Sequence, residues 1–462
     1  MDHTLSFQPE LLRRYDKSGP RYTSYPTAVQ FRPEFGADAY RESAARSNDL
    51  RPQKPLSLYV HLPFCGTVCY YCACNKVITK DHSRAEPYLQ RLFREIAMQG
   101  ELFDRARRVD QLHWGGGTPT FISHPEMHAL MGTLARSFNL RSDDGGEYSI
   151  EVDPRAANGE TIRILREIGF NRISLGVQDF DPVVQKAVNR IQSEEETIAV
   201  INAARDSGFR SINIDLIYGL PHQSRDSFGR TLDRIIEMHP ERLSVFNYAH
   251  LPELFKPQRR INAADLPTAA VKLDILQLTI DKLGAAGYVY IGMDHFARPD
   301  DELAIAQRNR TLYRNFQGYS THADCDLVAM GITAIGKVGN CYNQNVRTLD
   351  EYYKHIDEGR LAIMRGVELS SDDLLRREII TQLICHFELD LTAIQARHSI
   401  LFSDYFRTEL AELEFMQGDG LLTLDTHSIR VLPAGKLLIR NICMVFDRYL
   451  RSQRNQRFSK VI

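Results

Sequence analysis

Two kinds of sequence segment alternate along residues 55–295, and this alternation constrains the fold more than any other feature of the chain. Short runs rich in β-branched and apolar residues are typical of buried strands, and the stretches between them have the apolar spacing of amphipathic helices. Six strand–helix pairs in succession predict a parallel sheet with right-handed crossovers. The expected strands are "LSLYVH", "VDQLHW", "YSIEV", "FNRISLG", "SINIDLIYG" and "RLSVFNY". A full eight-fold barrel and an open doubly wound sheet fit this pattern equally well.

Unusual polar motifs follow these strands directly. The cysteine-rich segment "HLPFCGTVCYYCACNK" (61–76) follows the first strand and "GGGTP" (115–119) follows the second. Glu151 and Asp153 end the third strand, "GVQDF" follows the fourth, and Asp215 ends the fifth. In both candidate folds the chemistry lies at the carboxyl ends of the strands. We therefore expect one functional site at this edge.

The flanks differ from the alternating region, and 462 residues are too many for one ordinary core. Residues 1–50 contain few periodic segments and predict an arm with short helices, which could fold over the barrel mouth as a lid. Residues 51–360 are assigned to the barrel. Residues 361–462 predict a mainly helical second domain that begins with a capped helix and later contains a hairpin followed by a helix.

Composition excludes several classes of partner. The 57 basic and 59 acidic residues give a net charge of −2, so no global charge attracts nucleic acid or an anionic membrane. No apolar run is long enough to span a bilayer, and the first residues lack the pattern of a secretory signal. We therefore expect a cytoplasmic protein and, without a coiled coil or large apolar stripe, a monomer.

Four of the eight cysteines lie within ten positions: Cys65, Cys69, Cys72 and Cys74. In a reducing compartment such thiols indicate metal binding or catalysis, not disulfides. Structural zinc usually takes two ligand pairs a dozen or more residues apart, and two-cluster ferredoxins use a different spacing. Three close thiolates can wrap one face of a cubane iron–sulfur cluster. If only the first three bind, one iron lacks a protein ligand, and an open metal position indicates chemistry.

The C-x₃-C-x₂-C loop after the first strand resembles that of the radical S-adenosylmethionine (SAM) enzymes. The similarity covers nearly the whole chain and is closest to the oxygen-independent coproporphyrinogen III oxidase (dehydrogenase) family. It rests on "RYTSYPTA", "YVHLPFC", "CxCNK", "HWGGGTPT", "SIEVDPR", "SLGVQDF", "NIDLIYGLP", "LSVFNYAHLP", "GMDHFARPDDELA", "RNFQGYST" and "FSKVI". The resemblance implies an α/β fold with a partial (β/α)6 radical-SAM barrel, one [4Fe–4S] cluster and two SAM molecules in one site.

The resemblance also implies a reaction. The family converts coproporphyrinogen III to protoporphyrinogen IX in haem and tetrapyrrole biosynthesis, turning two propionate side chains into vinyl groups by oxidative decarboxylation. An electron donor such as a flavodoxin-type reductant is expected as a partner. A haem-binding chaperone of the same superfamily is the main alternative, and Cys74, the "RYTSYPTA" arm and Arg190 argue against it. A different radical SAM enzyme and a zinc-stabilised structural protein are further alternatives.

Site residues follow from the matched motifs. The implied cluster ligands are Cys65, Cys69 and Cys72, whereas Cys74 matches no ligand and stands in "CAC" where the family usually has "CGC". The residues implied to contact SAM are Tyr59, Tyr71, Gly116, Gly117, Thr118, Glu151, Gln178, Arg190, Asp215, Ala249 and Ile335. A substrate with four carboxylates calls for basic partners. The candidates are Arg21, Lys256, Arg259, Arg260, His295 and Arg298.

Overall fold

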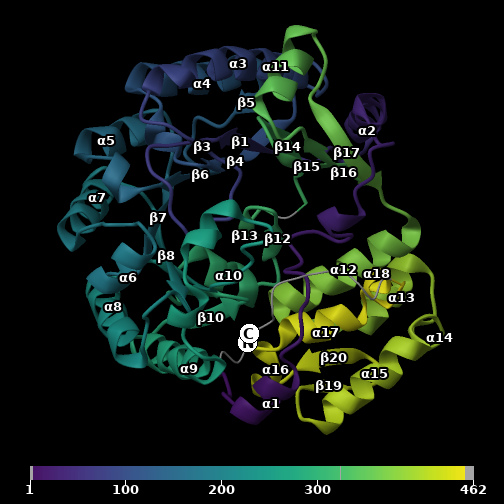
Figure 1. The fold of residues 1–462 in the computed structure, drawn as a ribbon. Coiled ribbons are helices and arrows are strands. Elements are labelled where there is room, and N and C mark those ends of the chain that lie inside the picture. Colours follow the sequence, from purple (N-terminus) through teal and green to yellow (C-terminus); the bar gives the residue numbers. More distant parts are fainter. Residues whose placement is uncertain (1–3, 323, 453–462) are drawn as a thin grey trace. The chain divides into compact units, whose positions relative to one another are not determined.

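The structure is a computed structural model that describes residues 4–322 and 324–452. The motif "FSKVI" at 458–462 lies outside the described residues. The chain divides into two compact units. The barrel unit comprises residues 30–268 and 324–368, and the accessory unit comprises residues 4–29, 269–322 and 369–452 (Figure 1).

The barrel unit is built on one sheet in which the six predicted strands are parallel and pair in chain order. These strands are β1 (Leu56–Leu62), β4 (Arg108–Gly116), β6 (Glu147–Val152), β7 (Arg172–Gln178), β8 (Ser211–Tyr218) and β9 (Arg242–Asn247). Because the order never reverses, the doubly wound alternative is wrong. A full eight-fold barrel is not formed either, and the partial (β/α)6 barrel is confirmed.

Past β1 the sheet continues in a way that the alternating pattern did not predict. Strand β14 (Asp326–Met330) pairs with β1 in parallel, and three antiparallel strands follow it. They are β15 (Ile335–Val338), β16 (Cys341–Asn345) and β17 (Ile363–Glu368). The short strands of this unit are β2 (Phe64–Cys65), β3 (Val77–Ile78) and β5 (Asn139–Leu140).

Helices cover the outer face of the six parallel strands. Figure 1 shows α3, α4, α5, α7 and α8 along the outside of the arc from β1 to β8. The helices of the barrel unit are α2 (Ala37–Asp49), α3 (Glu86–Gly100), α4 (His124–Ser137), α5 (Gly159–Glu167), α6 (Pro182–Ala187), α7 (Glu194–Asp206), α8 (Arg225–Glu237) and α11 (Leu349–Asp357). Capping boxes at Ser123, Ser193 and Ser224 begin three of them. Between sheet and helices lie apolar side chains such as Trp114 and Phe170, whose ring centroids are 4.9 Å apart.

The accessory unit is mainly helical, as predicted. Its helices are α1 (Pro9–Arg14), α9 (Ala269–Ala285), α10 (Glu302–Arg308), α12 (Ser371–His386), α13 (Leu391–His398), α14 (Phe402–Tyr405), α15 (Arg407–Gly418), α16 (Pro433–Lys436), α17 (Ile439–Val445) and α18 (Arg448–Ser452). Its strands are β10 (Val289–Gly292), β11 (His295–Ala297), β12 (Tyr313–Asn315), β13 (Gly318–Ser320), β18 (Glu388–Asp390), β19 (Leu422–Leu424) and β20 (Ser428–Val431). The predicted capped helix is α12 and the predicted hairpin is β19–β20. Up to residue 452, where the described residues end, three short helices follow the hairpin instead of one.

The N-terminal arm contributes more buried residues to a hydrophobic core than its sequence predicted. Leu12 and Tyr15 are buried with Leu421 and Leu438, and the Tyr15 hydroxyl donates to Asp419 at 2.7 Å. The predicted boundaries 1–50, 51–360 and 361–462, and the role of the arm as a lid, stay predictions. Among the residues that the structure describes, no helix has the length and apolarity needed to cross a membrane.

Candidate active site

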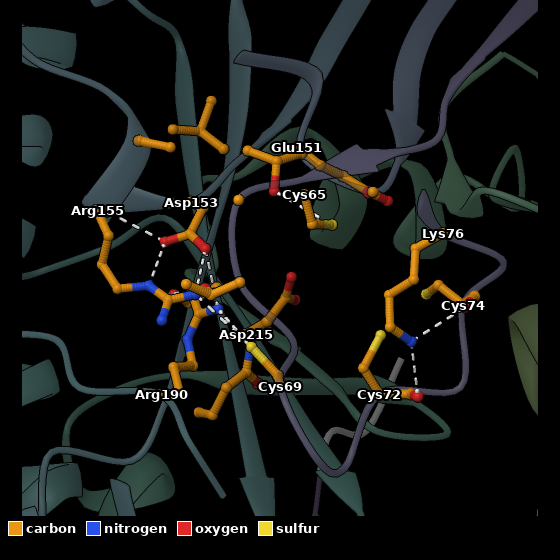
Figure 2. A pocket seen from close by; sticks show the side chains of 18 of the residues that line it. Cys65, Cys69, Cys72, Cys74, Lys76, Glu151, Asp153, Arg155, Arg190 and Asp215 are labelled. Carbon is orange, nitrogen blue, oxygen red and sulfur yellow. Dashed lines mark hydrogen bonds and ion pairs between the residues drawn. The ribbon is translucent and has the colours of Figure 1, made fainter. Parts of the chain in front are cut away.

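A cavity of about 570 Å³ lies at the carboxyl ends of the parallel strands, where the sequence places the polar motifs. The cysteine loop and the ends of β4, β6, β7 and β8 line it, and Figure 2 shows the side chains. The predicted site residues that it brings together are Cys65, Cys69, Tyr71, Cys72, Gly116, Gly117, Thr118, Glu151, Gln178, Arg190 and Asp215. With Cys74 also in its lining, one pocket combines four thiols, three carboxylates and two arginines.

Hydrogen bonds from side-chain donors stabilise the conformation of the cysteine loop. Lys76 Nζ donates to the carbonyl oxygens of Cys72 at 3.0 Å and Cys74 at 3.2 Å. The Thr118 hydroxyl donates to Cys65 Sγ at 3.6 Å. These contacts fix the loop while the thiols face the cavity (Figure 2).

The thiols differ in their electrostatic surroundings. A hydrogen bond from Cys74 lowers the pKa of Cys72 to about 6, because it and the charge of Lys76 outweigh the opposing effect of burial. Burial raises the pKa of Cys65 to about 11. Since the thiolate is the form that binds metal, Cys72 is the better prepared of these two ligands.

Two glycines of "GGGTP" are required by close packing against the cysteine loop. Gly116 has φ +117°, and a Cβ there would lie 2.6 Å from the His61 ring. A Cβ on Gly117 would lie 2.7 Å from the Pro63 carbonyl. The second strand can approach the loop only without these side chains, which also leaves the Gly116 N–H free to donate to Glu151 at 3.1 Å.

The two predicted acidic residues have different environments. Glu151 is the penultimate residue of β6, whereas Asp215 lies three residues before the end of β8, so the prediction that it ends its strand is wrong. The side chain of Glu151 is 47% exposed in the cavity. Burial of its carboxylate would raise the pKa of Glu151, but hydrogen bonds from His113 and the Gly116 N–H, and the charge of His113, lower it. Asp215 accepts from Ser174 at 2.9 Å and from Asn213 at 2.8 Å, and burial raises its pKa. Donors from the neighbouring strand β4 therefore hold Glu151, and donors from β7 and from β8 itself hold Asp215.

Gln178 and Arg190 carry polar atoms without partners. A shift in the β7–β8 register follows Gly176, and Gln178 has φ 69°. Such a bulge re-aims a side chain, and Gln178 lines the cavity as a result. Among the described residues, neither Gln178 Oε1 nor Arg190 Nε has a hydrogen-bond partner, although both atoms are buried. Buried polar groups without partners indicate that a ligand completes the site.

Three predicted SAM contacts do not line this cavity. The Tyr59 hydroxyl shares a hydrogen bond with His61 Nδ1 at 3.0 Å, and its ring stacks on that of His113. The Ala249 carbonyl accepts from Gln258 at 3.2 Å. Ile335 begins β15. Their assignment to SAM stays a prediction.

The basic candidates for substrate binding are spread over both units. Lys256, Arg259 and Arg260 form one short 3₁₀ segment of the barrel unit, where the Arg260 guanidinium lies 5.2 Å from the Tyr70 ring centroid. None of these three lines the cavity. In the accessory unit, Arg21 pairs with Asp294 at 2.6 Å and Arg298 with Asp300 at 3.4 Å. The His295 ring meets that of Tyr319 edge to face.

Among the charged lining residues, Lys76 and Arg155 were not predicted as site residues, and Asp153 was predicted at this edge without a role. Asp153 accepts from Arg155 Nη2 at 2.6 Å and from Arg190 Nη1 at 3.2 Å. The sequence signal was present in "EVDPR", where an acid and a base follow a strand end, and in "CNK" beside the cysteines.

The donor set fits an iron–sulfur cluster and a polar nucleoside ligand. Among the described residues, no group of three or more His, Cys, Asp or Glu side chains is placed to hold one metal ion. A cubane takes its thiolates on different irons and suits a wider spread. The orphaned atoms of Gln178 and Arg190 and the carboxylates of Glu151 and Asp215 supply hydrogen-bonding groups for a second ligand beside it.

Comparisons with known proteins agree with this donor set. The family model "Radical SAM superfamily" matches residues 59–235, and the model "HemN C-terminal domain" matches residues 369–438. The oxygen-independent coproporphyrinogen III oxidase of Pseudomonas aeruginosa is 56% identical over 99% of both chains. The protein of that name from Escherichia coli is 52% identical over 98% of both chains.

A solved structure supports the same relationship. Coproporphyrinogen III oxidase (HemN) from Escherichia coli, described as a radical SAM enzyme, superimposes with a TM-score of 0.92 at 50% identity. It covers 97% of this chain and 100% of that chain. With similarity of this extent over nearly its full length, the chain belongs to the oxygen-independent coproporphyrinogen III oxidase family of radical SAM enzymes.

Proposed function

We propose that this chain catalyses the oxidative decarboxylation of coproporphyrinogen III without oxygen. Two propionate side chains would each lose a β-hydrogen, carbon dioxide and an electron and become vinyl groups, giving protoporphyrinogen IX. The observation that carries the proposal is that the three predicted cluster thiols line one cavity together with the carboxylates of Glu151 and Asp215, in a chain from this family. When bound, the [4Fe–4S] cluster and SAM supply the 5′-deoxyadenosyl radical that removes the hydrogen.

The side chains of the cavity divide the work of holding these groups. Cys65, Cys69 and Cys72 would hold the cluster by three corners and leave its fourth iron for SAM. Glu151 would accept hydrogen bonds from ribose hydroxyls, since its carboxylate faces the cavity and its lowered pKa keeps it ionised.

A second SAM molecule is proposed in the same cavity. One ribose needs one carboxylate, and Asp215 provides a second acceptor with its own donors, Ser174 and Asn213. The orphaned polar atoms of Gln178 and Arg190 belong to residues that line the same pocket as Asp215. Equilibrium dialysis of the reconstituted protein with labelled SAM tests this: we expect two bound molecules per chain, and one in Asp215→Asn.

The substrate contacts remain proposals as well. The carboxylates of coproporphyrinogen III call for arginine, lysine or histidine, and the six predicted basic residues stay the candidates. A flavodoxin-type electron donor is also proposed on the family resemblance, and a monomeric state and a cytoplasmic location are proposed on the sequence pattern.

Anaerobic reconstitution followed by incubation with coproporphyrinogen III, SAM and a strong reductant tests the function. We expect protoporphyrinogen IX together with 5′-deoxyadenosine, and we expect Cys69→Ser to lose both products. Cys325→Ala is the matched control, because Cys325 is a buried thiol outside the cysteine loop. Tight haem binding with no turnover of coproporphyrinogen III would instead support the chaperone alternative, which the oxidase names of the full-length relatives do not favour.

A further inference from the structure

Cys69 differs from the other thiols of the loop in having two guanidinium groups against its sulfur. Arg155 Nη2 and Arg190 Nη1 each donate to Cys69 Sγ at 3.6 Å. Arg190 comes from the segment after α6, whereas Arg155 follows β6 directly. Arg190 is already a predicted SAM contact, but nothing so far gives Arg155 a role.

The local sequence fixes the direction of the Arg155 side chain. Asp153 caps the 3₁₀ turn Pro154–Ala156 by accepting from the Arg155 N–H, and Pro154 begins that turn. The Arg155 guanidinium then folds back on the same carboxylate, with Nε at 2.9 Å and Nη2 at 2.6 Å. A two-point contact of this kind holds the planar guanidinium in one orientation. The free edge of Nη2 is thereby aimed at Cys69 (Figure 2).

The charges of this group do not balance without the sulfur. Two guanidinium cations share the single carboxylate of Asp153, and their side chains are only 18% and 7% exposed. Two cations in so little water need more negative charge than one carboxylate carries. A thiolate at Cys69 supplies one charge, and a cluster on that thiolate gains a further negative charge when it takes up an electron.

We propose that Arg155 is a positioning residue that raises the reduction potential of the cluster through its N–H bond and charge at Cys69 Sγ. The inference rests on the proposed cluster ligands. Hydrogen bonds to ligand sulfurs and nearby charge set the potential of iron–sulfur clusters. A fixed cation stabilises the state with one more electron, since in a site with little water its field is weakly screened. One electron enters, and no bond to Arg155 forms or breaks.

The test is an EPR-monitored redox titration of anaerobically reconstituted protein without SAM. We expect Arg155→Met to retain full iron content and to disfavour the reduced cluster at least tenfold, a shift of about 59 mV toward negative potential for one electron. Arg155→Lys keeps the charge but loses the two-point contact, so its potential should lie between those of Arg155→Met and the unaltered protein. This second variant also keeps the test valid if the methionine variant fails to fold.

Arg141 provides a matched control. Its side chain is 16% exposed and it pairs with a carboxylate two residues away, Asp143, as Arg155 does with Asp153. It lies before β6, at the opposite end of that strand from the cavity. Arg141→Met should leave the potential unchanged.

An unchanged potential in Arg155→Met with full iron content would overturn the inference and leave the proposed function intact. An equal shift in Arg141→Met would also overturn it. Protein without iron after reconstitution would instead overturn the proposed function itself.

Discussion

Buried charged and polar side chains at the two ends of the barrel sheet differ in their hydrogen-bond partners. At the amino ends of the strands, Arg107 lies before β4 and Asp326 begins β14, and their side chains are 0% and 1% exposed. At the carboxyl ends, Arg190 and Gln178 bury polar atoms for which the described residues offer no partner. Both ends contain arginine and aspartate, so residue type does not distinguish them.

Completeness of pairing distinguishes the Arg107–Asp326 network from the side chains of Gln178 and Arg190. Arg107 donates to the Lys54 carbonyl at 2.9 Å, to Asn48 at 3.1 Å and to Asp326 at 2.6 Å. Asp326 also accepts from Ser47 and from the Gly339 N–H. A network that satisfies itself stabilises the fold, whereas one with open positions costs stability until a ligand arrives. The comparison separates structural charge from functional charge.

The largest expected effect comes from breaking the complete network. Asp326→Asn keeps the shape but leaves the Arg107 cation without its counter-charge, and removing one partner of a buried pair costs about 3–5 kcal/mol. Urea unfolding of the apoprotein measures this loss. The control is Glu167→Gln, since Glu167 pairs with Arg163 on the surface, where about 0.5 kcal/mol or less is expected. A loss below about 1 kcal/mol for Asp326→Asn would contradict the comparison.

At the carboxyl ends of the strands we expect a small effect on stability and a large effect on ligand binding. Glu151→Gln should change the free energy of unfolding by no more than about 0.5 kcal/mol, because the carboxylate is half exposed and awaits a ligand. The affinity of the Glu151→Gln variant for SAM should fall by about 10- to 100-fold, since a hydrogen bond to a charged group contributes about 1.5–3 kcal/mol. Calorimetric titration of reconstituted protein with SAM measures this, with Glu167→Gln again as the control. A destabilised variant with unchanged SAM affinity would reverse the assignment.

The sequence could predict where the site lies but not how its charges pair. Period and composition place strand ends locally, so Cys65, Glu151 and Asp215 were predicted at one edge and meet there. The partners of Cys69 come from positions 86 and 121 residues later in the chain, and no local pattern determines where those guanidinium groups point.

The same reason explains two other differences. The antiparallel strands β15–β17 depend on an edge left open beside β14, which local periodicity does not reveal. Tyr59 faces His61 and His113 instead of the cavity, although it stands on the first strand beside the cysteine loop.

Gln258 tests this comparison further, because its side chain is fully hydrogen-bonded although it lies near the carboxyl ends of the strands. Its side chain is buried, accepts from the Leu251 N–H at 2.6 Å and donates to the Tyr71 carbonyl at 3.0 Å. If complete hydrogen bonding, and not position in the sheet, identifies residues that stabilise the fold, Gln258→Leu should lower the free energy of unfolding by about 1–2 kcal/mol. Urea unfolding measures it, with the exposed Gln90→Leu as control. An unchanged stability would mean that location matters more than pairing.

The smallest expected effect is at Asp144, a partly exposed member of the amino-end networks. It accepts from Asn171 at 2.9 Å and from Arg166 at 2.9 Å, and it pairs with Arg210 at 3.0 Å. Burial alone would raise the pKa of Asp144, but these donors outweigh it and lower the pKa. Its stabilisation is therefore present above the unfolded-state value of about 3.9 and is lost as the pH falls through the lower folded-state value.

Asp144→Asn suits this test, because Asp144 has φ 55° and asparagine tolerates that conformation. At pH 7 the variant should be less stable by up to about 1 kcal/mol, since solvent screens the pairs. Below about pH 4 the difference between the two proteins should shrink, as protonation removes the charge that the variant lacks. Urea unfolding across this pH range measures the difference. A difference that grows on acidification would show that Asp144 contributes through its shape and not through its charge.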